Sequence, residues 1–280
     1  MATEISDWND LDNVRNDLSG DYVLVNDLDS DTDGYAGIGD DFEPIAEQSL
    51  DGDFYEGVFD GGGFEIRDLI VDSTERNVGL FSGIRSPGEI KNLSVVGDIT
   101  TSSDSFNAGV LCSENRGSIE NCAAAGSVTA LSITYAGGLV GRNSATVIES
   151  YATGSVEGDE RVGGLVGRND GTVTESYATG SVEGDERVGG LVGLNTDTVT
   201  ESYATGSVEG DFLVGGLVGS TFSSDEIDSY WDTETSGQST SAGDATGLTT
   251  AEMQGSEAET NMDGFDFADV WETADLMDIY

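Results

Sequence analysis

Carboxylates are the only abundant side chains in this sequence that could perform chemistry. The 280 residues include 55 Asp and Glu, 10 Lys and Arg and no histidine, which leaves a formal net charge of −45. Without histidine, Ser-His-Asp and Cys-His catalysis and zinc peptidases of the HExxH type are excluded. The negative charge would repel a phosphate backbone, and no apolar stretch approaches the ~18 residues of a membrane helix. Neither nucleic-acid binding nor membrane insertion is therefore expected.

Four aspartates near the N-terminus have the spacing of a calcium loop. Asp29, Asp31 and Asp33 precede Gly34 in the pattern DxDxDG, and Asp40 stands at the twelfth position of the loop. Alternate carboxylates can converge on one Ca²⁺ ion while the glycine permits the turn. However, acidic residues are frequent throughout the chain, and Asp is a weaker closing ligand than Glu. The segment is therefore interpreted first as a solvated acidic loop, with a Ca²⁺ site at these four aspartates as the alternative.

Three acidic turns recur later in the chain and would stack on one another. They contain Glu157/Asp159/Glu160, Glu183/Asp185/Glu186 and Glu209/Asp211, and Arg161 and Arg187 could pair with them locally. Like charges one strand apart repel, so cations should gather along this ridge, either as diffuse salt or at specific sites. Two carboxylates can also hydrolyse a glycosidic bond. Near-identical repeats give each carboxylate the same surroundings, whereas a catalytic pair requires distinct ones. No enzyme is therefore expected, and a carboxylate-based polysaccharide-cleaving β-helix is the least favoured alternative.

The elements that position these residues come from an internal repeat. The segment GGLVG recurs every 26 residues, at 137, 163, 189 and 215. Each unit holds two short apolar runs between Gly or Asn turns and has no helical period, which predicts two strands per repeat. One such unit cannot bury its own apolar face, but stacked units can. The fold class is therefore predicted to be all-β, a parallel β-solenoid of about 26-residue coils that rise about 4.8 Å each.

Alternation along the second strand of each repeat separates an inward from an outward row. Small and β-branched residues, such as Ala178 and Val182, face inward. The opposite parity predicts an exposed ladder of Tyr and Thr side chains, made of Tyr151, Tyr177, Tyr203 and Tyr230 with Thr153, Thr179 and Thr205. Cross-strand stacking that fixes the register is the first interpretation of this ladder, and a ligand-binding platform is the alternative.

The first strand of each repeat is apolar at both parities, as at Leu165 and Val166. One of the two rows should face outward unless the chain bends there. An outward apolar row would require a cover or a partner. Cover by the terminal segments is the first interpretation, and an assembly interface is the alternative.

Atypical segments at both ends predict caps for the solenoid. The expected divisions are an N-terminal helical cap (1–20), initial coils (21–77), the repeat solenoid (78–231) and an irregular C-terminal cap and tail (232–280). Trp8, Leu11, Val14 and Leu18 have helical spacing behind a Ser6 cap, which predicts a short N-terminal helix. Thr249 and Glu252 form a capping-box pattern before the aromatic residues Phe265, Phe267 and Trp271.

The two cysteines, Cys112 and Cys122, stand ten residues apart in one predicted coil. Two cysteines are too few for a disulfide scaffold. They are interpreted as small buried residues, with a bridge across the coil as the alternative if the protein matures outside the cell.

With these residues identified, the chain resembles the GLUG-repeat family of bacterial and archaeal cell-surface, adhesin-like proteins. The resemblance extends over nearly the whole chain, through YVLVNDLD, FDGGGFEIRDL, GGLVGRN, ESYATGSV, YWDTETSG and GLTTAEM. It implies a parallel β-solenoid and a role in surface attachment or display. Some relatives append such repeats to IgA-cleaving zinc peptidases, but this chain has no histidine to bind the metal.

The charge imbalance predicts a halophile, an archaeon or a haloarchaeal virus, because molar salt screens the repulsion among the carboxylates. We expect a non-enzymatic attachment or display module that binds a cell-surface glycan or surface-layer protein. It would be an adhesin-like extracellular or cell-surface protein, which needs an export signal that is not visible here, or a virion tail or fibre component, which needs none. Other copies of this chain, in a homo-oligomer, or the components of a virion are considered as further partners. A structural spacer or fibre-building subunit without a ligand is the alternative.

Overall fold

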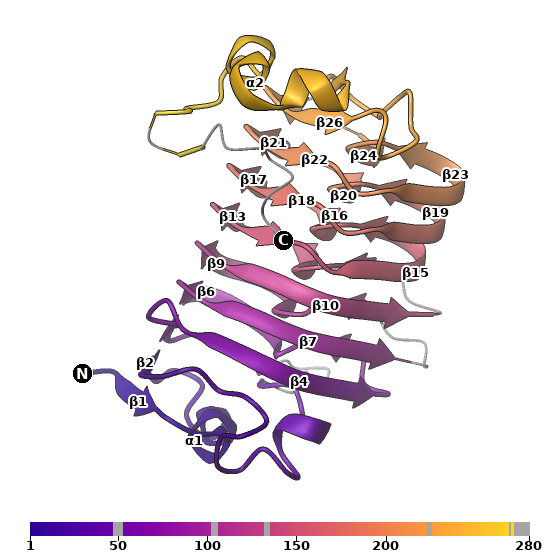
Figure 1. Ribbon diagram of the computed structural model, residues 1–280. Helices are drawn as coiled ribbons and strands as arrows, with labels where there is room; N and C mark the ends of the chain where they lie inside the picture. Colours follow the sequence, from indigo (N-terminus) through magenta and orange to yellow (C-terminus); the bar gives the residue numbers. More distant parts are fainter. Residues whose placement is uncertain (47–52, 102–105, 132–134, 223–225, 269, 272–280) are drawn as a thin grey trace.

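The computed structural model describes residues 1–46, 53–101, 106–131, 135–222, 226–268 and 270–271. The chain winds into a parallel β-solenoid, with the N-terminus and helix α1 (Trp8–Asn13) at one end and helix α2 (Gly255–Asn261) at the other (Figure 1). The coils contribute to a 13-stranded sheet, here sheet A, and a 14-stranded sheet, here sheet B. The predicted fold class, all-β with a parallel solenoid, is confirmed. None of the described helices is both long and apolar enough to cross a membrane.

Sheet A contains one strand or two short strands from each coil. Its main path is β1 (Thr3–Ile5), β2 (Tyr22–Leu24), β3 (Val58–Asp60), β6 (Phe81–Lys91), β9 (Cys112–Glu120), β12 (Val140–Asn143), β16 (Val166–Asn169), β20 (Val192–Asn195) and β24 (Val218–Thr221). A second row pairs with β9 and consists of β13 (Thr146–Ile148), β17 (Thr172–Thr174), β21 (Thr198–Thr200) and β25 (Glu226–Ile227).

Sheet B begins with long strands and continues with shorter ones. The long strands are β4 (Glu65–Ser73), β7 (Ser94–Thr101) and β10 (Ala123–Ala130). The next row is β14 (Tyr151–Ala152), β18 (Tyr177–Ala178), β22 (Tyr203–Ala204), β26 (Tyr230–Asp232) and β27 (Thr246–Leu248). Beside it lie β5 (Asn77–Val78), β8 (Asn107–Ala108), β11 (Tyr135–Gly137), β15 (Ser155–Gly163), β19 (Val182–Gly189) and β23 (Val208–Gly215).

The prediction of two strands per repeat is wrong. The repeat from Val166 to Gly189 forms four short strands, β16 to β19. A turn at 170–171 separates β16 from β17, and Glu175 between β17 and β18 has a φ of 50°. A left-handed residue breaks the pleat and turns the chain. Corners of the coil therefore divide the apolar runs into shorter strands. The hydrophobicity of the sequence did not indicate where these corners lie.

The inward rows are confirmed by register and burial. Val156 pairs with Val182 and Val182 with Val208, while Ala178 pairs with Ala152 and Ala204. The predicted inward residues of these rows are at most 2% exposed. They form one continuous hydrophobic core with the α1 residues Trp8 and Leu11. Each coil therefore buries its apolar side chains against the coils before and after it.

Both apolar parities of the GGLVG segment point into the core because the chain bends sharply there. Gly164 and Leu165 separate β15 from β16, and both Leu165 and Val166 are fully buried. A Cβ atom at Gly163 would lie 2.1 Å from the Val166 carbonyl oxygen and 2.7 Å from the Gly193 nitrogen. Only glycine permits such a close backbone approach. The expected cover of an outward apolar row by the terminal segments is wrong, since neither row is outward.

The N-terminal helix is confirmed, but it is shorter than predicted and begins after a different cap: α1 ends at Asn13, and Leu18 lies in a turn beyond it and is half-buried. Trp8, Leu11 and Val14 are fully buried, and the last of them begins η1 (Val14–Asn16). The N-cap is Asp7, not Ser6, because the Asp7 carboxylate accepts from the Asp10 nitrogen at 2.9 Å. Ser6 instead donates its N–H and hydroxyl to the Asp10 carboxylate. A later turn, η2 (Gly39–Asp41), follows within the initial coils.

At the other end, the predicted capping box of Thr249 and Glu252 is confirmed, at the start of η3 (Thr250–Met253). Helix α2 follows η3 directly. Cys112 and Cys122 are free and buried, so the interpretation as small buried residues is confirmed. Burial raises the pKa of the Cys122 thiol to about 12, which keeps it protonated and unreactive.

Candidate ligand-binding face

The outward face of sheet B presents the same residues in successive coils. Tyr151 pairs with Tyr177, Tyr177 with Tyr203, and Tyr203 with Tyr230. The first three rings stack nearly parallel, with centroids 4.8 and 5.0 Å apart and interplanar angles of 3° and 4°. The predicted outward stacking that keeps the coils in register is therefore present. We call these four residues the Tyr ladder.

The prediction that the Tyr ladder is exposed is wrong for three of its members. Tyr177 is 8% exposed, Tyr203 0% and Tyr230 5%, and only Tyr151 is half-buried. The ladder points away from the core, as predicted, but a second apolar cluster from the C-terminal segment covers it. That cluster contains Met253, Ala258, Met262, Phe265 and Trp271. An outward row of aromatic rings would leave a large apolar patch in water, and the segment removes it.

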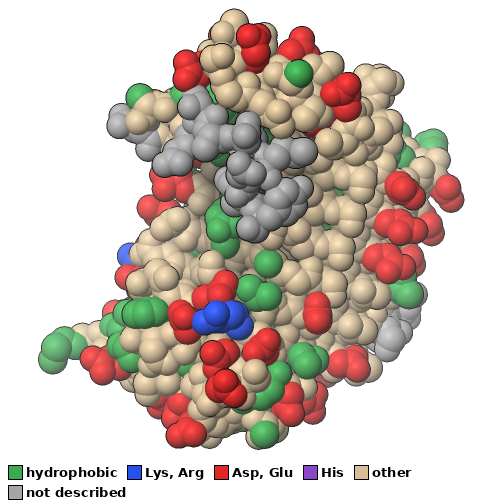
Figure 2. Space-filling model, in the orientation of Figure 1, with side chains coloured by type: hydrophobic (Ala, Val, Ile, Leu, Met, Phe, Trp, Pro, Cys, Tyr) green, Lys and Arg blue, Asp and Glu red, His purple; other side chains and the backbone are tan. Residues whose placement is uncertain are grey.

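The Tyr ladder is continued by hydroxyl side chains that remain accessible. Thr153, Thr179 and Thr205 are half-buried, and the serines two residues further on, Ser155, Ser181 and Ser207, are exposed. We call these six residues the hydroxyl stripe. Figure 2 shows acidic side chains gathered along the right-hand edge of one face of the molecule, with a largely uncharged, tan surface beside them. A protein of net charge −45 thus has a flat region of uncharged hydrogen-bonding groups.

The acidic turns form the rim of the hydroxyl stripe. Glu157 pairs in register with Glu183, and Glu183 with Glu209, so the predicted stacking is confirmed. These three and Asp159, Asp185 and Asp211 line a shallow groove of about 580 Å³. Arg161 forms an ion pair with Glu160, and Arg187 with Glu186. In the last coil Phe212 takes the place of this glutamate and is 61% exposed.

The four aspartates of the candidate calcium loop are not brought together. The Asp29 carboxylate accepts from the Asp31 nitrogen and the Thr32 hydroxyl, both at 3.0 Å, and the Asp40 carboxylate accepts from the Gly37 nitrogen at 2.6 Å. The carboxylates of Asp29 and Asp40 therefore stabilise local turns. Within the described ranges, no three or more Asp, Glu, His or Cys side chains, including Asp31 and Asp33, are grouped to hold a metal ion.

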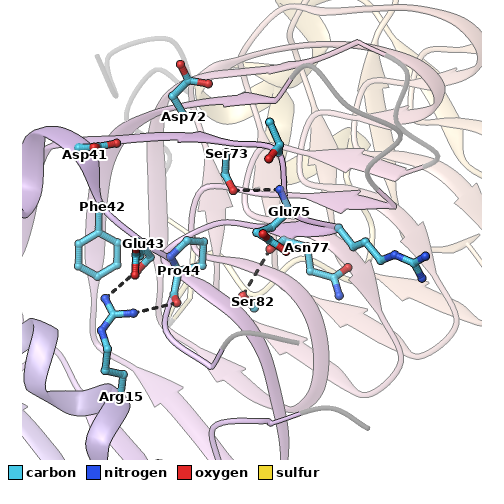
Figure 3. A pocket seen from close by; sticks show the side chains of 12 residues that line it. Arg15, Asp41, Phe42, Glu43, Pro44, Asp72, Ser73, Glu75, Asn77 and Ser82 are labelled. Carbon is cyan, nitrogen blue, oxygen red and sulfur yellow. Dashed lines mark hydrogen bonds between the residues drawn. The ribbon is translucent and has the colours of Figure 1, made fainter. Parts of the chain in front are cut away.

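A pocket of about 350 Å³ lies beside the initial coils (Figure 3). Its one buried ring, Phe42, lies beneath the guanidinium of Arg15. Arg15 also donates to the carbonyl oxygens of Glu43 and Pro44 and pairs with Asp12. Its donors are engaged in holding these segments together. This pocket is therefore explained by the packing of the cap on the first coils.

Sequence reasoning missed a buried ladder of asparagines at the corner of sheet A. Each Asn side chain donates to the next one, from Asn115 to Asn143, Asn169 and Asn195, over 2.8, 2.8 and 2.9 Å. The last donates to Glu226 Oε1 at 2.7 Å. All five side chains are at most 1% exposed. We call these five residues the Asn ladder. Its signal in the sequence is an Asn four residues after the Leu of GGLVG, which recurs from one repeat to the next.

A second missed feature is an ion-pair network on sheet A. Glu114 pairs with Arg116 and Arg142, and Asp170 with Arg142 and Arg168. Burial alone would raise the pKa of Asp170, but hydrogen bonds from Arg168, Thr196 and Arg142 lower it. The five members of the network thus pair with one another within and between neighbouring coils.

Comparisons with known proteins agree with this architecture. Residues 132–157, 158–183 and 184–209 match the GLUG motif, so the predicted resemblance holds for these three units. The chain is 37% identical over 115 residues to a protein of Evansella cellulosilytica named "Putative Gly-rich membrane protein". That alignment covers 40% of this chain and 13% of the relative, so the chain spans a small part of the relative's length.

A solved structure shares the fold. It is the crystal structure of a "putative immunoglobulin A1 protease" from Bacteroides ovatus, with a TM-score of 0.67 and 19% sequence identity. The match covers 92% of this chain and 87% of that one. At this identity the likeness shows the fold and does not transfer an activity. The halophilic or archaeal origin stays a prediction from the charge.

Proposed function

We propose that this protein is a non-enzymatic attachment or display module that binds a cell-surface glycan through the outward face of sheet B. The observation that carries the proposal is the hydroxyl stripe, which repeats in register over three coils between an aromatic row and an acidic rim. Sugars are bound by hydrogen bonds from polar side chains together with the faces of aromatic rings. A repetitive face suits a repetitive ligand, because each coil can contact one unit of a polymer.

The charge distribution supports a neutral glycan as the ligand. Binding at a strongly charged surface requires the removal of hydrated ions, which is costly. The hydroxyl stripe avoids this cost because Thr and Ser hydroxyls can both donate and accept hydrogen bonds. The alternative ligand is a surface-layer protein.

The acidic rim does not favour an enzyme. Glu157, Glu183 and Glu209 occupy equivalent positions in consecutive coils. General acid and general base catalysis requires two carboxyl groups whose surroundings separate their pKa values. The similarity to a structure titled as a protease concerns the fold. We therefore retain the non-enzymatic proposal.

The name of the Evansella relative as a membrane protein supports a setting at the cell surface, as an adhesin-like protein. A virion tail or fibre component is the other setting that fits an attachment role. In both, the large negative charge suits molar salt, which screens the repulsion among carboxylates. A spacer without a ligand is the alternative, whereas a fibre built by stacking coils is disfavoured because α1 and the η3–α2 segment close the two ends.

The test is co-sedimentation of the purified protein with prokaryotic cells in molar salt, before and after the cells are stripped of surface glycan. Thr179→Glu places a charge in the middle of the hydroxyl stripe and should weaken binding about tenfold or more, since an unpaired charge in an interface is costly. Thr172→Glu, on β17 of sheet A in the same repeat, is the matched control and should bind normally. Equal binding of both variants would reject the hydroxyl stripe as the contact surface, and no binding to any cells would favour the spacer.

A further inference from the structure

We propose that the C-terminal segment 263–271 is a displaceable strap, and that the Tyr177–Tyr203 surface beneath it is a binding site for the apolar face of a pyranose ring. We call this segment the strap; residue 269 lies outside the described residues. The inference rests on the proposed function, because it assigns an aromatic subsite to the same glycan-binding face. The strap would then compete with the ligand for that subsite.

The surface beneath the strap is built as a platform. Tyr177 and Tyr203 are stacked with their rings nearly parallel, at an interplanar angle of 4°, and Tyr151 extends the row. Thr179 follows Tyr177 on the same face of the strand, two residues on. The aromatic row and the hydroxyl stripe are therefore parts of one surface. A sugar lying across the row, as Trp271 does, would contact the edges of the parallel rings and meet hydroxyl groups at its own edge.

The strap occupies the platform almost entirely through aromatic contacts. Trp271 meets Tyr203 with ring centroids 5.4 Å apart and an angle of 61°, and it also lies 6.1 Å from Tyr177. Phe265 stacks on Trp271 at 4.8 Å and contacts Tyr230 edge-on at 5.5 Å. These contacts show that the platform already accommodates a planar group. A flat apolar ligand face would use the same space.

The ring contacts between the strap and the coils are accompanied by a hydrogen bond between described residues. The Tyr230 hydroxyl donates to the Asp263 carbonyl oxygen at 2.8 Å. The backbone N–H groups of Phe267, Val270 and Trp271 donate to carbonyl groups within the strap itself. An element joined mainly by side-chain packing, and not by a backbone ladder, can leave without disrupting the sheet.

Two buried polar atoms indicate what the closed arrangement lacks. The Tyr203 hydroxyl and the Trp271 Nε1 are buried and have no hydrogen-bond partner among the described residues. Tyr203 is fully buried, and Trp271 is 8% exposed. A buried polar group without a partner is unfavourable compared with its hydrated form. A sugar hydroxyl beside Tyr203 would supply the missing partner, which an indole ring face does not.

Like charges also weaken the closed arrangement. Glu149, Glu175 and Glu201 recur beside the Tyr ladder, one in each coil. Burial, and then the negative charges of Glu201, Glu149 and Asp266, raise the pKa of Glu175. Asp266 belongs to the strap, so docking brings it towards carboxylates of the same sign. The strap is therefore held by ring contacts against both charge repulsion and lost hydrogen bonds.

The experiment combines footprinting of tyrosines with glycan binding, both on the full chain. Hydroxyl-radical labelling of Tyr177 and Tyr203, measured by peptide mass spectrometry, reports whether the strap covers them. Retention on immobilised neutral hexasaccharides of glucose, mannose and N-acetylglucosamine reports the ligand. The double variant Phe265→Ala/Trp271→Ala removes the strap's rings and should raise both signals about tenfold, the effect of losing one good aromatic contact. Val270→Ala, at an exposed strap residue, is the control and should change neither.

Two further variants keep every ring of the strap. Gly264→Ala should also open the strap, because Gly264 has a φ of 91° and a Cβ atom would lie 2.6 Å from the Asp228 side chain. Gly255→Ala is its control, with a positive φ but open space around it. Tyr203→Phe should act in the opposite direction. It removes the hydroxyl that lacks a partner, so labelling of Tyr177 and retention of glycan should both fall.

The outcomes separate the strap from the function. Increased labelling together with increased glycan retention in the opening variants supports the inference. Unchanged labelling in both opening variants would overturn the strap. Equal glycan retention in open and closed variants would overturn the subsite while the attachment function stands. Increased labelling without retention of any glycan, including by the parent chain, would reject the proposed function and with it the pyranose subsite.

Discussion

The Asn ladder and the Tyr ladder are two rows of identical residues in the same coils, yet their environments are the reverse of what polarity suggests. The polar row is fully buried and each amide has a partner. The aromatic row points away from the core and is covered by a separate segment, with one hydroxyl left unpartnered. A repeat therefore specifies which residues align, but the path of the chain at each corner decides whether a row becomes core or surface.

The two ladders differ in which part of the chain supplies the groups that contact them. An Asn side chain in the ladder receives partners from its own coil and both neighbours, so burial requires nothing beyond the repeat. The Tyr ladder needs the strap, which comes from outside the repeat. The first row should therefore be rigid and intolerant of substitution, and the second adaptable.

The largest effect is expected from breaking the Asn ladder at its middle. Asn169 donates to Asn195 Oδ1 and to the Gly171 and Thr198 carbonyl oxygens, and accepts from Asn143. Asn169→Ala leaves these buried groups without partners and should lower the free energy of unfolding by about 4 kcal/mol.

Urea unfolding at fixed salt measures this loss. Asn16→Ala, at an exposed asparagine, is the control and should cost less than about 0.5 kcal/mol. A loss below about 1 kcal/mol for Asn169→Ala would contradict the view that the ladder is a buried, fully bonded unit.

Removing the central ring of the Tyr ladder should have a smaller effect. Tyr177 stacks between Tyr151 and Tyr203 and contacts Trp271. Tyr177→Ala should cost about 2 kcal/mol in the same urea experiment, because water can enter where the strap leaves. Tyr151→Ala, at the half-buried end of the row, should cost less. If Tyr177→Ala proved as costly as Asn169→Ala, the proposed contrast between the two ladders would be wrong.

The end of the Asn ladder should respond to pH. Burial raises the pKa of the Glu226 carboxyl above its ordinary value of 4.5, although hydrogen bonds from Asn195 and the Asp244 nitrogen oppose the rise. The folded state therefore favours the protonated form. Its contribution to stability is fully present below the unfolded pKa and is lost as the pH rises through the folded pKa.

Glu226→Gln isolates this effect, because all other carboxylates are common to both proteins. The stability of the variant relative to the parent should increase as the pH rises above about 4.5. The lost hydrogen bond from the Asp244 nitrogen should cost about 1 kcal/mol at low pH. Thermal unfolding at several pH values and one salt concentration measures the difference. A difference independent of pH would show that Glu226 has the same pKa in both states.

The smallest expected effect concerns the corner beside the Tyr ladder. Glu175 has a φ of 50° and faces carboxylates in the neighbouring coils, whereas Asn121 occupies the same kind of corner with a φ of 51°. Asn adopts the left-handed region more readily than Glu and carries no charge. Glu175→Asn should therefore stabilise the protein by about 0.5 kcal/mol at neutral pH. Glu183→Asn, in the acidic rim, is the control, and destabilisation by Glu175→Asn would contradict the argument.

Much of the fold could be predicted because the repeat is nearly exact. The period of GGLVG and the alternation of Ala178 and Val182 predicted parallel coils and their inward rows, since strand parity depends only on local geometry. The corners could not be predicted in this way. Asn169 was interpreted as a turn residue, since Asn is common in turns, and its buried bonds to other coils are contacts between repeats that no single repeat contains.

The candidate site was predicted in part for the same reason. The Tyr ladder and its register follow from spacing, but its cover depends on a segment that is far away in the sequence. The calcium pattern at Asp29 and Asp40 matched a motif by spacing alone, whereas turn geometry directs these two carboxylates to nearby N–H groups.

The sequence by itself determined the all-β class, the parallel stacking and the rows, because identical units can bury their apolar faces only against one another. Only the tertiary structure decided that both apolar rows of GGLVG turn inward, that asparagines line the buried corner, and that Trp271 covers the Tyr ladder. These outcomes depend on close backbone approach and on contacts between distant segments. Such contacts arise once the coils are stacked, so a recurring residue such as Asn169 shows that a row exists but not whether the row is buried.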